Sequence, residues 1–71
     1  MKYFVLWHIY NQDHLICWQE FDLIVCLPDD LTQQLTQREG YYKKKYHSAY
    51  VSPIPVIHQI LLLDQKNHHQ S

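Results

Sequence analysis

The stretch LPDDLTQQLTQREG, at residues 27–40, most constrains what this chain can fold into. Its proline ends the apolar run before it, and the aspartates that follow suit the N-cap of a helix. Asp30 with Gln33 resembles a capping box. Mostly apolar residues then recur at steps of three and four, which predicts one face of a helix. This stripe consists of Leu31, Leu35, Arg38, Tyr42, Tyr46 and Ala49.

The end of this helix has two interpretations, because Gly40 is the only glycine of the chain. A glycine commonly terminates a helix in the left-handed cap geometry. Alternatively the helix continues through Gly40 to about His47, as the stripe indicates. Pro53 and Pro55 then exclude helix and central-strand pairing and favour an extended approach. Residues 56–63 are typical of a final buried strand.

The first ten residues show a strand pattern. Residues 2–10 alternate with period two, and their odd positions form a wholly apolar face. That face consists of Tyr3, Val5, Trp7 and Ile9. The even positions form a mixed face, on which His8 is either a partly buried histidine or part of a pH-responsive interface. Residues 11–14 are polar and suit a turn.

The apolar stretch after this turn allows more than one interpretation. Residues 15–20 and 21–27 are either two strands with a break near Glu20 or one long bent strand. The competing interpretation is a helix over residues 14–26, with Asp13 as its cap. The large apolar residues here resist a helical amphipathic stripe, which favours strands.

The order of these elements predicts an α+β fold. We expect a small mixed β-sheet of three to four strands, in β-β-(β)-α-β order, with one helix packed on one face. The strand–helix–strand connection implies a right-handed crossover to a parallel strand. A chain of 71 residues is predicted to be a single domain. We place this domain at residues 1–64, and we expect a polar, disordered C-terminal tail at residues 65–71.

One helix cannot cover both faces of such a sheet. The strands carry apolar residues on both sides, at Val5, Leu6, Ile24, Val25, Ile60 and Leu61. A bare face of several hundred square ångströms is more than soluble monomers usually expose. A second copy of the chain is the simplest cover, so the sequence predicts a homodimer.

Aromatic residues are the second signal for an interface. They make up 14% of the chain, which is many rings for one small core. Tryptophan and tyrosine are enriched at binding hot spots. We therefore expect partner-binding residues at Tyr3, Trp7, Trp18 and Tyr50. The leading hypothesis is a small protein-interaction module that regulates or inhibits a partner protein of unknown identity, a type of protein found in phages, plasmids and bacteria.

The lysine run in GYYKKKYH, at residues 40–47, has a structural and a functional interpretation. Basic residues in the last turn of a helix complement its dipole, and they would face water. The alternative is a nucleic-acid-binding module or an acidic protein partner. Its residues would be Arg38, Tyr41, Lys43, Lys44 and Lys45. A net charge of −1 disfavours nucleic acid, because such binders are usually strongly basic.

Little in the sequence points to catalysis, metals or cofactors. One glycine cannot build a phosphate-cradling loop, and no nucleophile has a recognisable base. The six histidines lack ligand spacing, so we predict no enzyme activity, no metal and no cofactor. Glu20 and Asp22 could share one strand face; such residues usually mark a solvated face, and a paired acid function is the alternative.

The two cysteines and the apolar segments bear on the compartment. Cys17 and Cys26 lie in apolar runs without CxxC spacing, which predicts buried and reduced thiols. The first residues begin like a signal peptide, but no small-residue cleavage site follows them. No segment approaches the roughly 20 apolar residues of a membrane span. We therefore expect a cytoplasmic protein.

Overall fold

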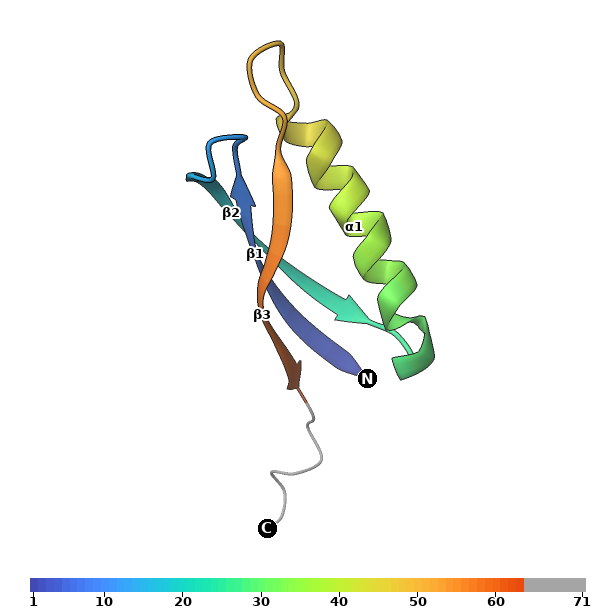
Figure 1. The fold of residues 1–71 in the computed structure, drawn as a ribbon. Helices are drawn as coiled ribbons and strands as arrows, with labels where there is room; N and C mark the ends of the chain where they lie inside the picture. Colours follow the sequence, from blue (N-terminus) through green and yellow to red (C-terminus); the bar gives the residue numbers. More distant parts are fainter. Residues whose placement is uncertain (64–71) are drawn as a thin grey trace.

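Three strands form one sheet, and a single α-helix lies across one of its faces (Figure 1). The structure is a computed structural model, and it describes residues 1–63. Its elements are β1 (Lys2–Tyr10), β2 (Ile16–Val25), the 3-10 turn η1 (Pro28–Asp30), α1 (Leu31–Tyr46) and β3 (Ile54–Leu63). The predicted α+β fold is confirmed, with three strands. The predicted tail at residues 65–71 lies outside the described residues.

The strand order of the sheet is β2-β1-β3, and β1 pairs antiparallel with both neighbours. The crossover through α1 does bring β3 back in the direction of β2, as predicted. Because β1 lies between them, however, the two never pair, and no parallel pair occurs among the described strands. The expectation of a mixed sheet is wrong in this respect.

β2 is one continuous strand that pairs with β1 along its length. The break near Glu20 and the helix over residues 14–26 are therefore wrong, and the interpretation as one long strand is right. The connecting turn is held by Asn11, whose Oδ1 accepts hydrogen bonds from the backbone N–H groups of Asp13 (2.9 Å) and Leu15 (3.0 Å). The Asn11 side chain thus takes the place of a backbone carbonyl as the hydrogen-bond acceptor of the turn.

Both ends of the helix had a prediction that the structure tests. Asp30 occupies the N-cap position with helical dihedrals and makes no side-chain cap hydrogen bond, so the predicted capping box does not form. The preceding 3-10 turn starts at Pro28, which fits because proline suits a first helical turn. At its other end α1 continues through Gly40 to Tyr46. The interpretation in which the helix passes Gly40 is confirmed.

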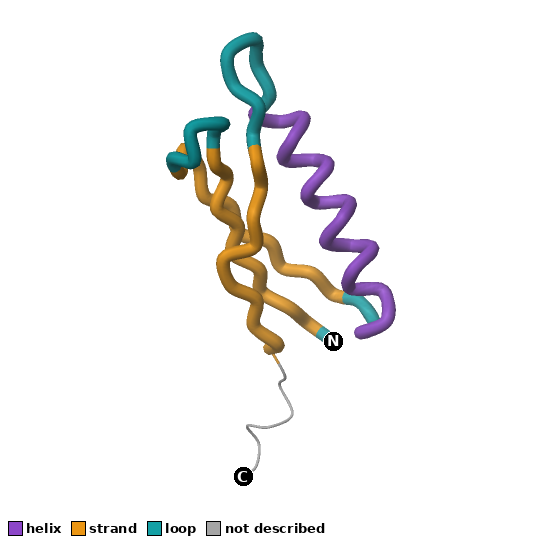
Figure 2. The backbone as a smooth tube through the Cα atoms, viewed as in Figure 1, coloured by secondary structure: helices purple, strands orange, loops and turns teal. Residues whose placement is uncertain are grey.

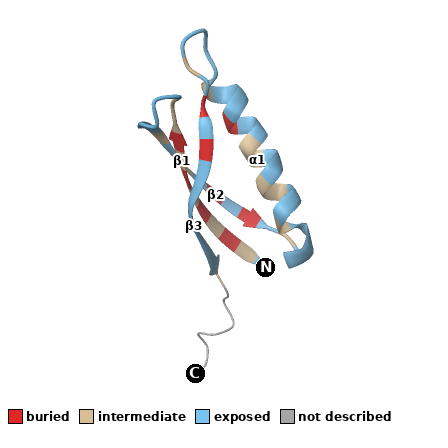
Figure 3. Ribbon diagram, viewed as in Figure 1, coloured by how far each residue is buried: buried red, intermediate tan, exposed pale blue. Residues whose placement is uncertain are grey.

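The core lies between α1 and the face of the sheet that it covers (Figure 3). Its buried apolar members are Tyr3, Val5, Trp7, Ile9, Ile24 and Tyr42. The predicted apolar face of β1 and the helical stripe thus pack against each other. Pro55 is buried beside Ile9 on the edge strand β3, and an edge is where a strand tolerates proline.

The two loops at one end of the sheet lie close together in the backbone trace (Figure 2). Gln12 joins them, because its Nε2 donates to the Tyr50 carbonyl at 2.9 Å and its Oε1 accepts from the Ser52 N–H at 3.1 Å. One amide side chain therefore connects the β1–β2 turn to the segment that leads into β3.

The cysteines are both free, as predicted, but neither is buried. Cys17 is exposed and Cys26 is half-buried against the core. The expectation of burial is wrong because alternation along β2 turns Cys17 away from the helix, while its neighbour Trp18 faces it.

Candidate interaction surface

A polar cluster around Asp22 lies between the helix and the sheet. Asp22 is only 9% exposed. Its Oδ2 accepts a hydrogen bond from Trp7 Nε1 at 2.9 Å. Its Oδ1 accepts from the Tyr42 hydroxyl at 2.8 Å and from Arg38 Nη2 at 2.9 Å. The predicted solvated position of Asp22 is therefore wrong, because three donors on β1 and α1 replace water around the carboxylate.

The protonation states of this cluster are fixed by its geometry. The hydrogen bond to Asp22 raises the pKa of the Arg38 guanidinium, so this group stays charged. Burial raises the pKa of the Tyr42 hydroxyl to about 12, so it remains a donor at neutral pH. The Asp22 carboxylate thus has one charged partner and two neutral donors, and removing it would leave these groups unpaired in a buried place. The cluster holds α1 on the sheet.

A second polar contact joins Glu20 to the end of the helix. Lys45 Nζ lies 2.7 Å from Glu20 Oε2, and the Tyr46 hydroxyl donates to the same oxygen. The hydrogen bond from Lys45 is the main cause that lowers the pKa of Glu20. Trp18 stacks on the Tyr46 ring, with centroids 4.3 Å apart and planes 20° apart. Glu20 is thus a helix contact as well, not a purely solvated residue.

The predicted nucleic-acid-binding residues are largely engaged in these contacts. Arg38 binds Asp22 and also lies over the Tyr41 ring, 4.6 Å from its centroid. Lys45 pairs with Glu20, and Lys43 Nζ lies 3.5 Å from Glu39 Oε2. Lys44 is exposed. Carboxylates therefore neutralise three of the four cations that were predicted to bind nucleic acid.

The other face of the sheet is apolar, and no described element covers it. We call it the open face and define its apolar patch by six residues, Phe4, Leu6, Phe21, Leu23, Val25 and Leu61. Strand pairing places Ile16, Ile54, Val56 and Leu63 on the same face, toward the two ends of the sheet. Cross-strand pairing places these residues in rows, because paired residues of neighbouring strands share a face. Phe4 pairs with Leu23 on one side and with Leu61 on the other. The Phe4 and Phe21 rings stack with centroids 5.5 Å apart.

Charge is nearly absent from the open face. Lys2, at one corner, is the only charged residue that the pairing registers place on it among the described residues. The two carboxylates of β2, on Glu20 and Asp22, lie on the helix side. Near the centre, His8 and His58 stack with ring centroids 4.0 Å apart and planes 13° apart. This surface therefore matches a neutral, apolar partner surface.

The structure brings three of the four predicted partner-binding residues into or against the core, and only Tyr50 lies apart from it. Tyr3 and Trp7 belong to the core, and Trp7 is only 2% exposed. Trp18 is half-buried against Tyr46. Tyr50 is 86% exposed and lies in the segment before β3. The open-face residues Phe4, Phe21 and Leu23 were not selected from the sequence.

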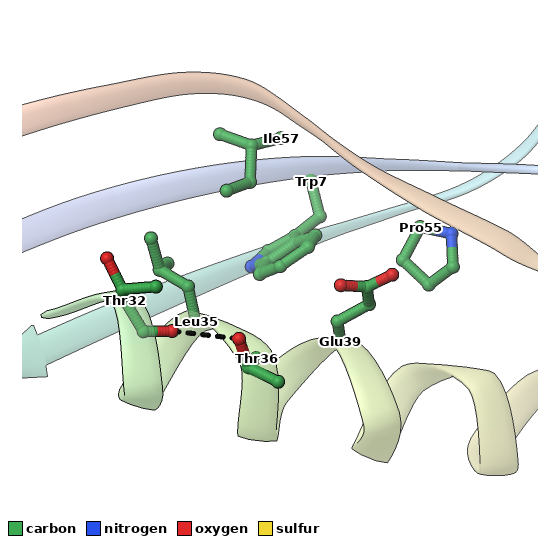
Figure 4. A pocket seen from close by; sticks show the side chains of 7 residues that line it. All are labelled: Trp7, Thr32, Leu35, Thr36, Glu39, Pro55 and Ile57. Carbon is green, nitrogen blue, oxygen red and sulfur yellow. Dashed lines mark hydrogen bonds between the residues drawn. The ribbon is translucent and has the colours of Figure 1, made fainter.

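A shallow groove of about 300 Å³ lies between α1 and β3 (Figure 4). The sheet contributes apolar side chains to it, and the helix contributes Leu35 with polar side chains. Its lining consists of Trp7, Thr32, Leu35, Thr36, Glu39, Pro55 and Ile57. Glu39 is its one ionisable group, and Lys43 pairs with it. Besides this carboxylate the groove presents only the hydroxyls of Thr32 and Thr36, and the Thr36 hydroxyl donates to the Thr32 carbonyl at 2.9 Å.

Residues 1–63 offer little support for a metal site or a membrane-spanning helix. This part of the chain contains no cluster of three or more histidine, cysteine or carboxylate side chains suited to a metal ion. Its helices are too short or too polar to cross a bilayer. Comparisons of the chain with protein-family models, curated proteins and solved structures find no match.

Proposed function

We propose that this chain is a small protein-interaction module without catalytic activity, which regulates or inhibits by binding protein through its open face. The observation that supports this proposal is that the sheet face without described cover consists mainly of apolar side chains. Four of the six residues that define its apolar patch are exposed, namely Phe21, Leu23, Val25 and Leu61. Soluble proteins that keep such a patch usually use it for binding.

The size of the open face makes a protein partner favourable. Side chains of this kind present roughly 150–200 Å² when fully exposed, so six of them at the observed exposures offer on the order of 500 Å². Covering this area contributes about 10 kcal/mol at ~25 cal/mol per Å². Association itself costs ~4–15 kcal/mol, and the partner adds its own buried area. A protein surface of matching size therefore binds, whereas a small ligand covers too little of the face.

The basic residues do not favour a nucleic-acid function over this one. Three of the four cations already have a carboxylate partner, and each would need to lose it to neutralise a phosphate. The cytoplasm is the compartment we propose, because an exposed free thiol such as Cys17 suits a reducing environment.

Photo-crosslinking in cells that express the full chain tests the proposed function. A photoreactive phenylalanine analogue replaces Leu23, on the open face, or Leu62, which lies on the helix side of β3. Leu23 is 60% exposed and Leu62 is 51% exposed, so the two probes are matched in residue type and accessibility. We expect a protein adduct from position 23 and little from position 62. Absence of an adduct at position 23, or equal adducts at both, would contradict the proposal.

A further inference from the structure

We infer that the protein surface bound by the open face is the open face of a second copy of this chain. The two copies would pack sheet against sheet around a two-fold axis. This inference rests on the proposed function, since it names the partner for the same surface.

Area is the first argument for a second copy. Stable protein–protein interfaces bury about 800 Å² on each partner, with an apolar centre and a polar rim. The apolar members of the open face offer on the order of 500 Å², which suits the centre of such an interface. Tyr10, Gln19 and Gln59 lie around it on the same face and supply a polar rim. The open face of one copy therefore has the size and the composition needed to bind the open face of another copy.

Charge is the second argument. A partner of different sequence is usually selected by complementary charge, and the open face has only Lys2 to offer such a partner. A two-fold interface places each surface against itself, so a charged face would meet its own like charges. The central residues of the open face, Phe4, Leu6 and Phe21, carry no charge. Self-association consequently brings no repulsion to the centre.

The geometry of the sheet allows its faces to stack and hinders one of its two edges, β3, from joining another strand. Apolar rows such as Phe4, Leu23 and Leu61 can interdigitate with their copies, since stacked sheets lie about 10 Å apart. Edge pairing through β3 is hindered in its first half by Pro55 and by the register irregularity opposite Leu6 and Trp7. Proline and bulges are features that prevent strand addition at an edge.

Sedimentation equilibrium of the purified full chain at micromolar concentration tests the inference. We expect a mass of twice 8.7 kDa for the wild-type chain. Leu23→Lys should raise the dimer dissociation constant by roughly thirtyfold or more, as expected for a central interface residue. The matched control Leu62→Lys should remain dimeric. Val25→Lys, at another exposed open-face position, should weaken the dimer as well, and circular dichroism verifies that each variant is folded.

The outcomes separate the inference from the proposed function. A wild-type monomer at these concentrations overturns the second copy as partner. If position 23 still crosslinks a different protein in cells, the proposed function stands without it. Equal dissociation by Leu62→Lys and Leu23→Lys places the contact elsewhere and also overturns the inference. A dimer lost only through Leu23→Lys and Val25→Lys supports both.

Discussion

The two faces of the sheet differ in where their charged residues lie. The face that α1 covers contains the carboxylates of Glu20 and Asp22, together with their partners on the helix. The face left uncovered by the described residues is almost free of charge and lined with aromatic and aliphatic side chains. Burial normally selects apolar residues and water selects charged ones. The difference teaches that the covered face finds its polar partners within one chain, whereas residues 1–63 supply no cover for the open face.

Breaking the polar cluster on the covered face should have the largest effect. Asp22→Asn keeps the shape of the side chain but removes the charge and replaces one acceptor by a donor. We expect the free energy of unfolding to fall by about 3 kcal/mol. The reason is that Arg38 loses its charged partner, and either the Tyr42 hydroxyl or the Trp7 indole loses its acceptor. Urea titration followed by circular dichroism measures it. Under monomeric conditions, Leu23→Lys should change the same quantity by less than about 0.5 kcal/mol, as is usual for an exposed site.

A charge introduced at the histidine pair should weaken the contact at the open face. His8 stacks on His58 with ring centroids 4.0 Å apart. The other neighbours of His8 on this face are Tyr10, Gln19 and Val56, none of which is a carboxylate. His8→Lys would therefore place an unpaired charge in an apolar contact, and we expect self-association to weaken about tenfold. Sedimentation equilibrium measures it with His8→Gln as the uncharged control; equal dissociation constants for the two variants would contradict this expectation.

Gly40→Ala should stabilise the covered face without altering the open one. Gly40 lies within α1, has no positive φ, and an added Cβ would meet nothing within 4 Å. Replacing a mid-helix glycine with alanine contributes roughly 0.5–1 kcal/mol. Thermal unfolding should shift upward, while the dissociation constant of the dimer stays the same. A loss of stability would mean that the helix does not continue through residue 40.

The smallest effect is expected from the Glu20 contact at low pH. Lys45 and Tyr46 lower the pKa of Glu20 below its ordinary value of 4.5, so the charged form is favoured in the folded state. The stabilisation is present above that value and is lost as the pH falls through the lower, folded-state pKa. The stability difference between wild type and Glu20→Gln should therefore be constant near neutrality and vanish in acid. A difference that persists at low pH would contradict the contact.

Much of the fold could be predicted because its signals are local. Pro28 and the stripe from Leu31 to Tyr46 specify the helix, and the alternation of residues 2–10 specifies β1. The single strand β2 could not be separated from its alternatives, because apolar residues occur at both parities in ICWQEFDLIV. The position of β1 between the other strands depends on long-range pairing, which no local pattern encodes.

An apolar sheet face without cover was expected, and residues 1–63 leave one. The predicted contacts Tyr3 and Trp7 were selected by residue type, although they share the apolar face of β1 with Val5 and Ile9. That face meets the helix, whereas the even positions, such as Phe4, lie on the open face. Which residues bind a partner stays a prediction. Asp22 had a signal too, since a carboxylate in an apolar run requires partners.

Hydroxyl-radical footprinting at increasing protein concentration tests most directly whether the open face is shielded from water in the associated protein. Phe21 and Leu23 report on the open face, and Leu62 and Tyr50 are exposed references elsewhere. The account predicts that oxidation of Phe21 and Leu23 falls as the concentration rises from nanomolar to micromolar, while oxidation of Leu62 and Tyr50 stays constant. Oxidation of Phe21 and Leu23 that remains unchanged over this range would contradict the account.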